Sequence, residues 1–160
     1  SIEQLPHKEK AAAEQVLRDW ELELAHQAVA APDSLPLLEA LKSKGARCAV
    51  LTRNLEDLAH ITLEAAGLMQ YFKNEPILGR DSAPAKPSPV PIHSILKVWN
   101  AQASQSVMVG DYIFDMLSGQ AAGAHTLLKE STPISSWRPE LQEQLSYDYK
   151  VTTFFELINP

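Results

Sequence analysis

The sequence predicts an α/β protein with a Rossmann-like, three-layer arrangement, in which helices cover both faces of a parallel sheet. Three short apolar segments have the length of strands: ARCAVLT (46–52), PILGR (76–80) and SVMVG (106–110). Helical patterns of ten or more residues alternate with them, which favours parallel pairing through right-handed crossovers. The runs CAVL and VMV are continuously apolar rather than alternating, so we expect both of their faces to be covered.

The remaining elements follow from helical spacing and from residues that end helices. Apolar residues including Trp20 and Leu24 recur at roughly helical spacing, which predicts one long amphipathic helix over 7–30. Asp33 or Ser34 can cap a second helix, which ends at a glycine. The other expected elements are helices over 55–66, 90–101 and 112–122, a strand over 124–129, a helix within 137–145, and a short strand and final helical turn within 149–158.

Length and composition are those of one ordinary globular domain. The 160 residues are 45% hydrophobic and 21% charged, and the net charge is −6 without a basic cluster. This charge argues against a nucleic-acid or anionic-membrane partner. No apolar run approaches the roughly 20 residues of a membrane span, and the polar start does not resemble a signal peptide. Cys48 is the single cysteine, which excludes an internal disulfide and fits a cytoplasmic protein.

Polar side chains stand where the predicted strands end. Thr52 ends one strand, Asp111 follows another, and Lys86 lies in the loop after a third. Ligands of open parallel sheets bind outside the carboxyl ends of the strands, so we expect these three groups at one edge. Lys86 is surrounded by three prolines in APAKPSP (83–89), which stiffen its loop.

Asp111 and Asp115 are a pair of carboxylates four residues apart. Taken singly, Asp111 fits a helix N-cap and Asp115 a first-turn carboxylate favoured by the helix dipole. Together they share one helix face, where like charges repel unless a positive group sits between them. A hard divalent cation such as Mg²⁺ suits such a pair, because it binds carboxylates together with water and phosphate oxygens.

Three motifs carry a family resemblance. LTRN (51–54), AKPSP (85–89) and GDYIFD (110–115), in this order along an α/β chain, resemble the haloacid-dehalogenase superfamily, and the resemblance covers nearly the whole chain. It is strongest to small phosphoglycolate-phosphatase-like members with a short helical cap. The resemblance implies a Mg²⁺-dependent phosphatase that hydrolyses a small phosphorylated metabolite through an aspartyl-phosphate intermediate. It also implies a partial helical cap over residues 1–32 and an α/β core over 33–160.

The resemblance assigns a role to each motif residue. Thr52 would hydrogen-bond the transferring phosphoryl group, and Lys86 would neutralise the charges of the phosphate and the nucleophile. Asp111 and Asp115 would orient Mg²⁺ directly or through its water. The two residues after Thr52 would contact the substrate, although the second of them also fits a cap of the next helix: Arg53 and Asn54.

The chain departs from the family at one point. Members carry an Asp-x-Asp-Gly motif at the end of their first strand, and its first aspartate is the nucleophile. The segment RDWELE (18–23) has acidic residues but lies in a helical pattern with no strand before it. In the family the missing strand lies between those that end here at Thr52 and Asp111, so the core is expected to lack its first strand.

Three explanations of the missing motif stay open. The nucleophile can lie in an N-terminal segment outside this sequence, the chain can be a catalytically inactive module that binds phosphate and Mg²⁺, or a second polypeptide can supply the strand. A metal-independent haloacid dehalogenase is an alternative activity, against which the Asp111–Asp115 pair argues. A phosphorylation-switch receiver module is disfavoured, because its acidic pair precedes the hydroxyl and lysine residues.

Overall fold

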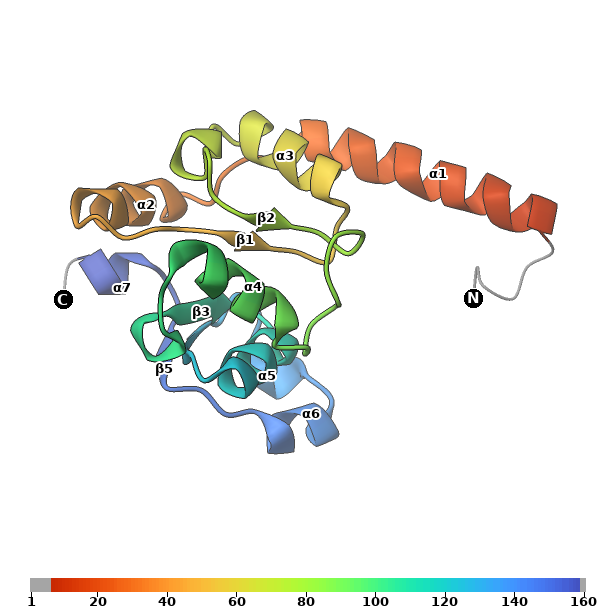
Figure 1. Ribbon diagram of the computed structural model, residues 1–160. Coiled ribbons are helices and arrows are strands. Elements are labelled where there is room, and N and C mark those ends of the chain that lie inside the picture. The colour runs from red at the N-terminus through yellow and green to blue at the C-terminus, as the bar shows by residue number, and fades with distance from the viewer. Residues whose placement is uncertain (1–6, 159–160) are drawn as a thin grey trace.

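The structure, a computed structural model, describes residues 7–158 (Figure 1). The longer helices alternate with short strands, as the sequence predicts. The helices are α1 (His7–His26), α2 (Ser34–Ser43), α3 (Glu56–Ala65), α4 (Val90–Trp99), α5 (Ile113–Ala122), α6 (Pro139–Gln144) and α7 (Phe155–Ile158). The strands are β1 (Val50–Leu51), β2 (Ile77–Leu78), β3 (Val107–Gly110), β4 (His125–Lys129) and β5 (Tyr149–Val151).

All the strand pairs in the described part of the chain are parallel, but they form two separate sheets. The first sheet has two strands in the order β1-β2, and the second has three in the order β3-β4-β5. Figure 1 shows α2 and α3 above the β1–β2 pair and α4 below it. The fold class predicted from the sequence is confirmed, with the difference that the sheet is divided between β1 and β3.

The edges of β1 and β3 that face each other carry peptide groups that do not pair with a strand within residues 7–158. Val50 and Thr52 donate their N–H groups to β2 over 3.0 and 2.9 Å, so the peptide groups of Leu51 point away from β2. In β3, Ser106 O accepts the N–H of His125 over 3.0 Å. The alternation of a parallel ladder therefore leaves Val107 and Val109 with their peptide groups on the opposite edge.

A largely apolar groove of about 670 Å³ lies between these two edges. Leu51 from β1 and Val107 to Val109 from β3 line it, together with side chains of α2, α3 and α4. Val107 and Val109 are 52% and 41% exposed. The prediction that both faces of VMV are covered is therefore wrong for these valines, because no strand lies beside β3 on this edge in the described residues.

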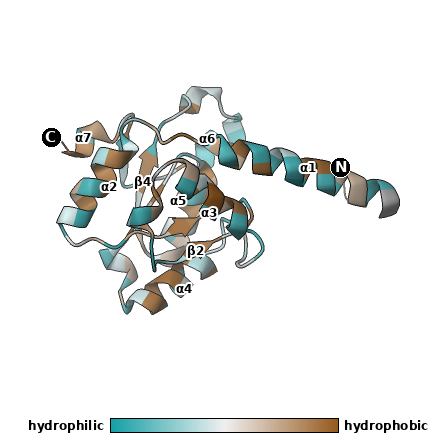
Figure 2. Cartoon of the chain, turned by 90° about the horizontal axis from the view of Figure 1, so that it is seen from above, coloured by the Kyte–Doolittle hydropathy of each residue, from teal (hydrophilic) through white to brown (hydrophobic). Residues whose placement is uncertain are grey.

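The well-packed interior lies on either side of the groove. One cluster is built on Ala59, Phe72 and Ile77 between α3 and the β1–β2 pair, and another on Ile92 and Leu96 of α4 with Ala122 of α5. Figure 2 shows hydrophobic colour concentrated on these central elements, whereas α1 carries hydrophilic segments along its length and extends away from the rest. None of the described helices combines the length and apolarity needed to cross a membrane.

Two elements differ most in length from the sequence prediction. The strand expected over 46–52 is reduced to Val50–Leu51, since pairing on one side alone holds fewer residues in a ladder. The first helix ends at His26 rather than at residue 30. Arg18 of this helix forms an ion pair with Asp57 of α3, in which Nη2 and Oδ2 are 2.6 Å apart.

Candidate functional site

Three segments converge where β1 and β3 end. Lys86, from the proline-rich loop after β2, lies with its Nζ atom 2.5 Å from Oδ1 of Asp115 in α5. The same ammonium group donates a hydrogen bond of 3.2 Å to the carbonyl oxygen of Leu51, on the free edge of β1. The carboxyl end of β1, the loop and the first turn of α5 therefore meet at one ammonium group, as the rule for parallel sheets predicts.

Asp115 is a buried carboxylate with both oxygens engaged. Its Oδ2 atom accepts the N–H of Tyr112 over 3.1 Å at the start of α5, while Oδ1 accepts Lys86. Gly110, the last residue of β3, makes room for it: a Cβ on Gly110 would lie 2.3 Å from Cβ and Cγ of Asp115. The glycine in GDYIFD thus has a steric role, because any side chain there would displace Asp115.

The loop that carries Lys86 is anchored to α5. Ser118 Oγ donates to the carbonyl oxygen of Ser88 over 2.8 Å, and Ser88 Oγ accepts the N–H of Val90 over 3.3 Å. Ser118 is fully buried, and the Lys86 side chain is only 12% exposed. These contacts hold the Lys86 side chain in place and largely out of solvent.

The residues that follow β1 also lie at the carboxyl end of this strand. Thr52 Oγ1 accepts the N–H of Asn54 over 3.1 Å, which leaves the hydroxyl proton of Thr52 free to be donated. The Arg53 guanidinium lies 5.8 Å from the ring centroid of Phe114 in α5. Asn54 does not cap α3, contrary to the alternative considered for it: the N–H of Glu56 is accepted by Asp81 Oδ1 over 3.0 Å.

Asp111 is exposed at the end of β3 and is not the N-cap of α5, a position that Tyr112 occupies. The two carboxylates of the motif therefore differ. Asp115 is buried and paired with Lys86, whereas Asp111 is exposed. Over residues 7–158 no group of three or more His, Cys, Asp and Glu side chains is arranged to hold a metal ion.

The carboxylate oxygens of Asp111 and Asp115 provide some of the ligands that a hard cation needs. Asp111 offers an exposed carboxylate, and Asp115 offers oxygens that already accept other donors. Mg²⁺ is commonly held by one or two carboxylates, with water and substrate phosphate completing its shell. The chain is compatible with that arrangement through Asp111, and it does not form a complete cage.

A buried cluster around Asp33 was not predicted as such. Asp33 stands at the start of α2 without a side-chain cap bond. Its carboxylate accepts Lys129 Nζ over 3.0 Å, Thr153 Oγ1 over 3.0 Å and the N–H of Phe154 over 2.8 Å. Burial opposes the charge, but the N–H of Phe154, Lys129 and Thr153 together lower the pKa of Asp33 to about 2. The carboxylate thereby joins α2 to the ends of β4 and β5.

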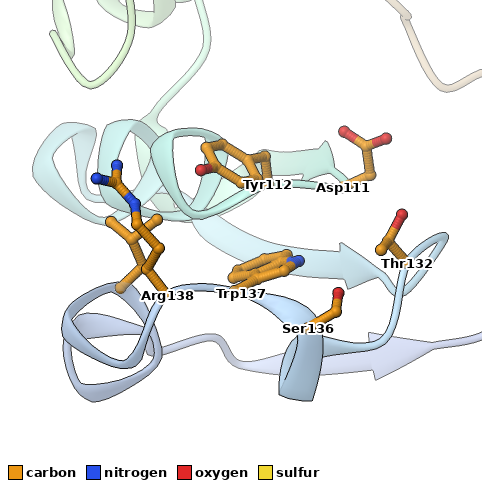
Figure 3. A pocket seen from close by; sticks show the side chains of 7 residues that line it. Asp111, Tyr112, Thr132, Ser136, Trp137 and Arg138 are labelled. Carbon is orange, nitrogen blue, oxygen red and sulfur yellow. The ribbon is translucent and has the colours of Figure 1, made fainter.

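A pocket of about 510 Å³ opens beside Asp111 and was also missed. Figure 3 shows Asp111 near one end, Arg138 near the other, and Tyr112 and Trp137 between them. The ring centroids of Tyr112 and Trp137 are 5.0 Å apart. Trp137 and Arg138 belong to the segment after β4, and the sequence has no motif there that indicates a binding role.

The fold and this edge define a class of protein: a parallel α/β domain with an ammonium group, a hydroxyl group and carboxylates at the carboxyl ends of its strands. Residues 1–129 match the sequence model of the haloacid dehalogenase-like hydrolases. The chain belongs to this family.

Individual relatives agree with this assignment. The chain is 38% identical over 92 residues to a phosphoglycolate phosphatase of Aquifex aeolicus, a match that covers 57% of this chain and 42% of the relative. It is 34% identical over 93 residues to the pyrophosphatase PpaX of Bacillus pumilus, covering 58% of this chain and 42% of that protein. These matches span less than half the length of the curated relatives.

A solved structure shows the same fold. The crystal structure of a predicted phosphoglycolate phosphatase from Haemophilus somnus superposes with a TM-score of 0.81 at 22% identity, over 96% of this chain and 67% of that one. The Rossmann-like architecture is thereby confirmed.

Proposed function

We propose that the complete protein is a Mg²⁺-dependent phosphatase that hydrolyses a small phosphorylated metabolite in the cytoplasm. The observation that carries this proposal is the buried ammonium group of Lys86, held 2.5 Å from Asp115 and beside the end of β1. Relatives named for phosphoglycolate and for pyrophosphate support the substrate class, a small molecule bearing a phosphoryl group.

The chain's own residues would supply charge neutralisation and positioning, which are the main needs of phosphoryl transfer. The free proton of Thr52 would be donated to a phosphate oxygen, with the hydroxyl oriented by the N–H of Asn54. Lys86 would offset the negative charge of the phosphate, and Asp115 would hold its ammonium group in place. Arg53 and Asn54 would contact the rest of the substrate.

Asp111 would hold the Mg²⁺ directly, and Asp115 would orient it directly or through a bound water. When bound, the ion supplies Lewis-acid neutralisation of charge on the phosphoryl oxygens. The exposure of Asp111 beside the buried Asp115 supports this division. A hydrolysis that does not need the ion would instead favour the dehalogenase type of chemistry.

The nucleophile would be an aspartate in an N-terminal segment outside residues 1–160. The groove between β1 and β3 has a largely apolar volume of about 670 Å³ and, within residues 7–158, no strand pairs with either edge, which supports a strand of that segment as its occupant. A residue at the carboxyl end of such a strand would arrive between Thr52 and Asp111. One carboxylate oxygen would attack phosphorus while the bond to the leaving oxygen breaks, and water would then release phosphate from the aspartyl phosphate.

Residues 1–32 would form part of a helical cap over this edge. Within the described part of that range, Arg80 binds Glu21 of α1 over 2.9 Å, and Arg18 binds Asp57 over 2.6 Å, so α1 is fastened to the core near β1. The Arg18–Asp57 pair lies between exposed side chains, and such ion pairs are weak, which suits an element that moves when substrate enters.

The test is a comparison of two proteins: the product of the complete reading frame and residues 1–160 alone. We expect the complete product to release inorganic phosphate from 2-phosphoglycolate, to lose this activity in EDTA and to recover it when Mg²⁺ is added. Residues 1–160 should release none. Halide release from 2-chloropropionate that persists in EDTA would point to a dehalogenase, and a complete product without hydrolysis of any phosphate compound would point to an inactive binding module.

A further inference from the structure

The side chain of Arg80, in the turn after β2, contacts two segments that are far from each other in the sequence. Its Nη1 and Nη2 atoms donate to the two carboxylate oxygens of Glu21 in α1 over 3.0 and 2.9 Å. Nη1 also donates to the carbonyl oxygen of Arg53 over 3.4 Å. One guanidinium group therefore joins α1 to residues 52–54, which are proposed to contact the phosphoryl group and the substrate.

The main chain of the same turn lies directly against that segment. The N–H of Arg80 donates to the carbonyl oxygen of Asn54 over 2.9 Å. At Gly79, a Cβ atom would lie 2.4 Å from the nitrogen of Glu56 and 2.8 Å from the carbonyl oxygen of Asn54. This close approach requires a residue without a side chain, and it fixes the turn and the main chain of Asn54 relative to each other.

Asn54 connects this turn to the hydroxyl group of Thr52. Its N–H donates to Thr52 Oγ1 over 3.1 Å, while its carbonyl oxygen accepts the N–H of Arg80. A displacement of Asn54 therefore changes the partner that orients the hydroxyl. In phosphoryl transfer such positioning matters, since a misplacement of about 1 Å at a reacting or binding group can lower a rate by about 100-fold.

The two ion pairs that fasten α1 to the core differ in strength and in reach. Arg18 and Asp57 are 48% and 53% exposed and meet through one short contact, whereas Glu21 is 17% exposed and binds Arg80 through both of its oxygens. A bidentate, partly buried pair fixes the geometry better than an exposed contact. Over residues 7–158, Arg18 forms no hydrogen bond with residues 52–54, so its pair does not extend to that segment.

We infer that Arg80 is a positioning residue, which transmits the placement of α1, through Glu21, to the main chain of Arg53 and Asn54 and so to the Thr52 hydroxyl. The catalytic part of this inference rests on the proposed function. The mechanical link between Glu21 and Asn54 does not depend on turnover. A cap that includes α1 would then influence the transfer step itself as well as access to the edge.

The test uses two matched substitutions on α1, Glu21→Gln and Arg18→Gln. Each removes one charge and one ion pair between α1 and the core, and over residues 7–158 neither side chain hydrogen-bonds to residues 52–54. Hydrogen exchange of the Asn54 amide is measured by NMR in the complete product without ligand. Glu21→Gln should speed this exchange about fivefold or more, and Arg18→Gln should leave it within about twofold. Adding Glu21→Gln to Arg80→Gln should have no further effect, because both remove the same link.

Turnover of 2-phosphoglycolate with Mg²⁺ gives the second readout. Glu21→Gln should lower kcat about tenfold with KM within about twofold, since the lost contact positions a group that acts in the transition state. Arg18→Gln should change both constants less than about twofold. A role of Arg80 in fastening α1 alone would affect the two variants alike.

The two readouts separate this inference from the proposed function. Equal Asn54 exchange in Glu21→Gln and Arg18→Gln would overturn the inference even if phosphate is hydrolysed. Faster exchange in Glu21→Gln with an unchanged kcat, in an active protein, would overturn the positioning role. Faster exchange in Glu21→Gln alone, in a protein that hydrolyses no phosphate compound, would support the link through Arg80 and contradict the proposed function.

Discussion

Lys86 Nζ and Asp115 Oδ1 lie 2.5 Å apart, in side chains that are 12% and 7% exposed. The pair joins the proline-rich loop to the first turn of α5 and directs the ammonium group toward the end of β1. The pair also gives the two carboxylates in GDYIFD different surroundings. Asp115 positions a lysine, and Asp111 is the carboxylate that stays exposed to a ligand.

Lys86→Met should destabilise the protein by about 2–4 kcal/mol, because it leaves the buried Asp115 carboxylate without its cation. Urea unfolding at pH 7 measures this, with Lys97→Met as the exposed control in α4. The double variant Lys86→Met, Asp115→Leu should recover part of the loss. Equal stability of Lys86→Met and the parent would mean that the ion pair is not formed in solution.

Gly110→Ala should damage the site through sterics alone. The new Cβ would lie 2.3 Å from Asp115 Cγ, so the carboxylate must move away from Tyr112 and Lys86. We expect about 1–3 kcal/mol of destabilisation and weaker vanadate binding by the complete product. A crystal structure of the variant with Asp115 in its original place would contradict this account of the glycine.

Asp111→Asn should weaken Mg²⁺ binding to the complete product by about tenfold or more while leaving its circular dichroism spectrum unchanged, since the side chain is exposed. Isothermal titration calorimetry gives the affinity. Glu64→Gln, which removes an exposed carboxylate of α3, serves as the control. If the two variants bind Mg²⁺ equally well, Asp111 has no role in holding the ion.

The Asp33 cluster predicts a pH dependence of stability. The folded pKa of about 2 lies below the ordinary 3.8, so the carboxylate stabilises the fold above pH 3.8 and loses this effect as the pH falls toward 2. Asp33→Asn should therefore cost about 1–3 kcal/mol at pH 7 and much less near pH 2. Denaturant titrations across this range, with the exposed Asp19→Asn as control, provide the measurement. If the difference in unfolding free energy between the parent and Asp33→Asn does not change with pH, the charge of Asp33 is not its cause.

Substitutions of two exposed valines test whether a strand occupies the groove between β1 and β3. Val107 is 52% exposed and lines the groove, whereas Val98 is 65% exposed and does not. If a strand fills the groove in the complete product, Val107→Lys should destabilise that product by about 2 kcal/mol or more, and Val98→Lys by less than about 0.5 kcal/mol. Equal destabilisation by the two substitutions in the complete product would mean that no strand fills the groove.

The sequence was sufficient to predict the order and type of the elements, because apolar runs and helical spacing are local signals. Thr52, Lys86 and Asp111 could be placed near one edge for the same reason, since a rule about strand ends connects them. The Lys86–Asp115 pair could not be predicted, because it depends on how the loop crosses α5. Asp33, one of the two residues expected to cap α2, takes the N-cap position without a side-chain cap bond, and its partners Lys129 and Phe154 are far away in sequence.

The short β1 and the exposed valines of β3 have a common cause, namely the division of the sheet. Continuous apolar runs predicted burial of β3, and Val107 and Val109 remain exposed because pairing on that edge is absent within residues 7–158. Arg138 and Trp137 were missed because a binding role for single residues after a strand has no sequence pattern. Their grouping with Asp111 appears only in three dimensions.

The most direct test of the central claim is to locate the phosphoryl group during turnover. The complete product is mixed with 2-phosphoglycolate and Mg²⁺, quenched in acid and mapped by peptide mass spectrometry. We predict one phosphorylated aspartate, located outside residues 1–160. Turnover with phosphorylation of a residue within 1–160, or without any phosphorylated residue, would contradict the account, as would a reading frame that encodes no residues before Ser1.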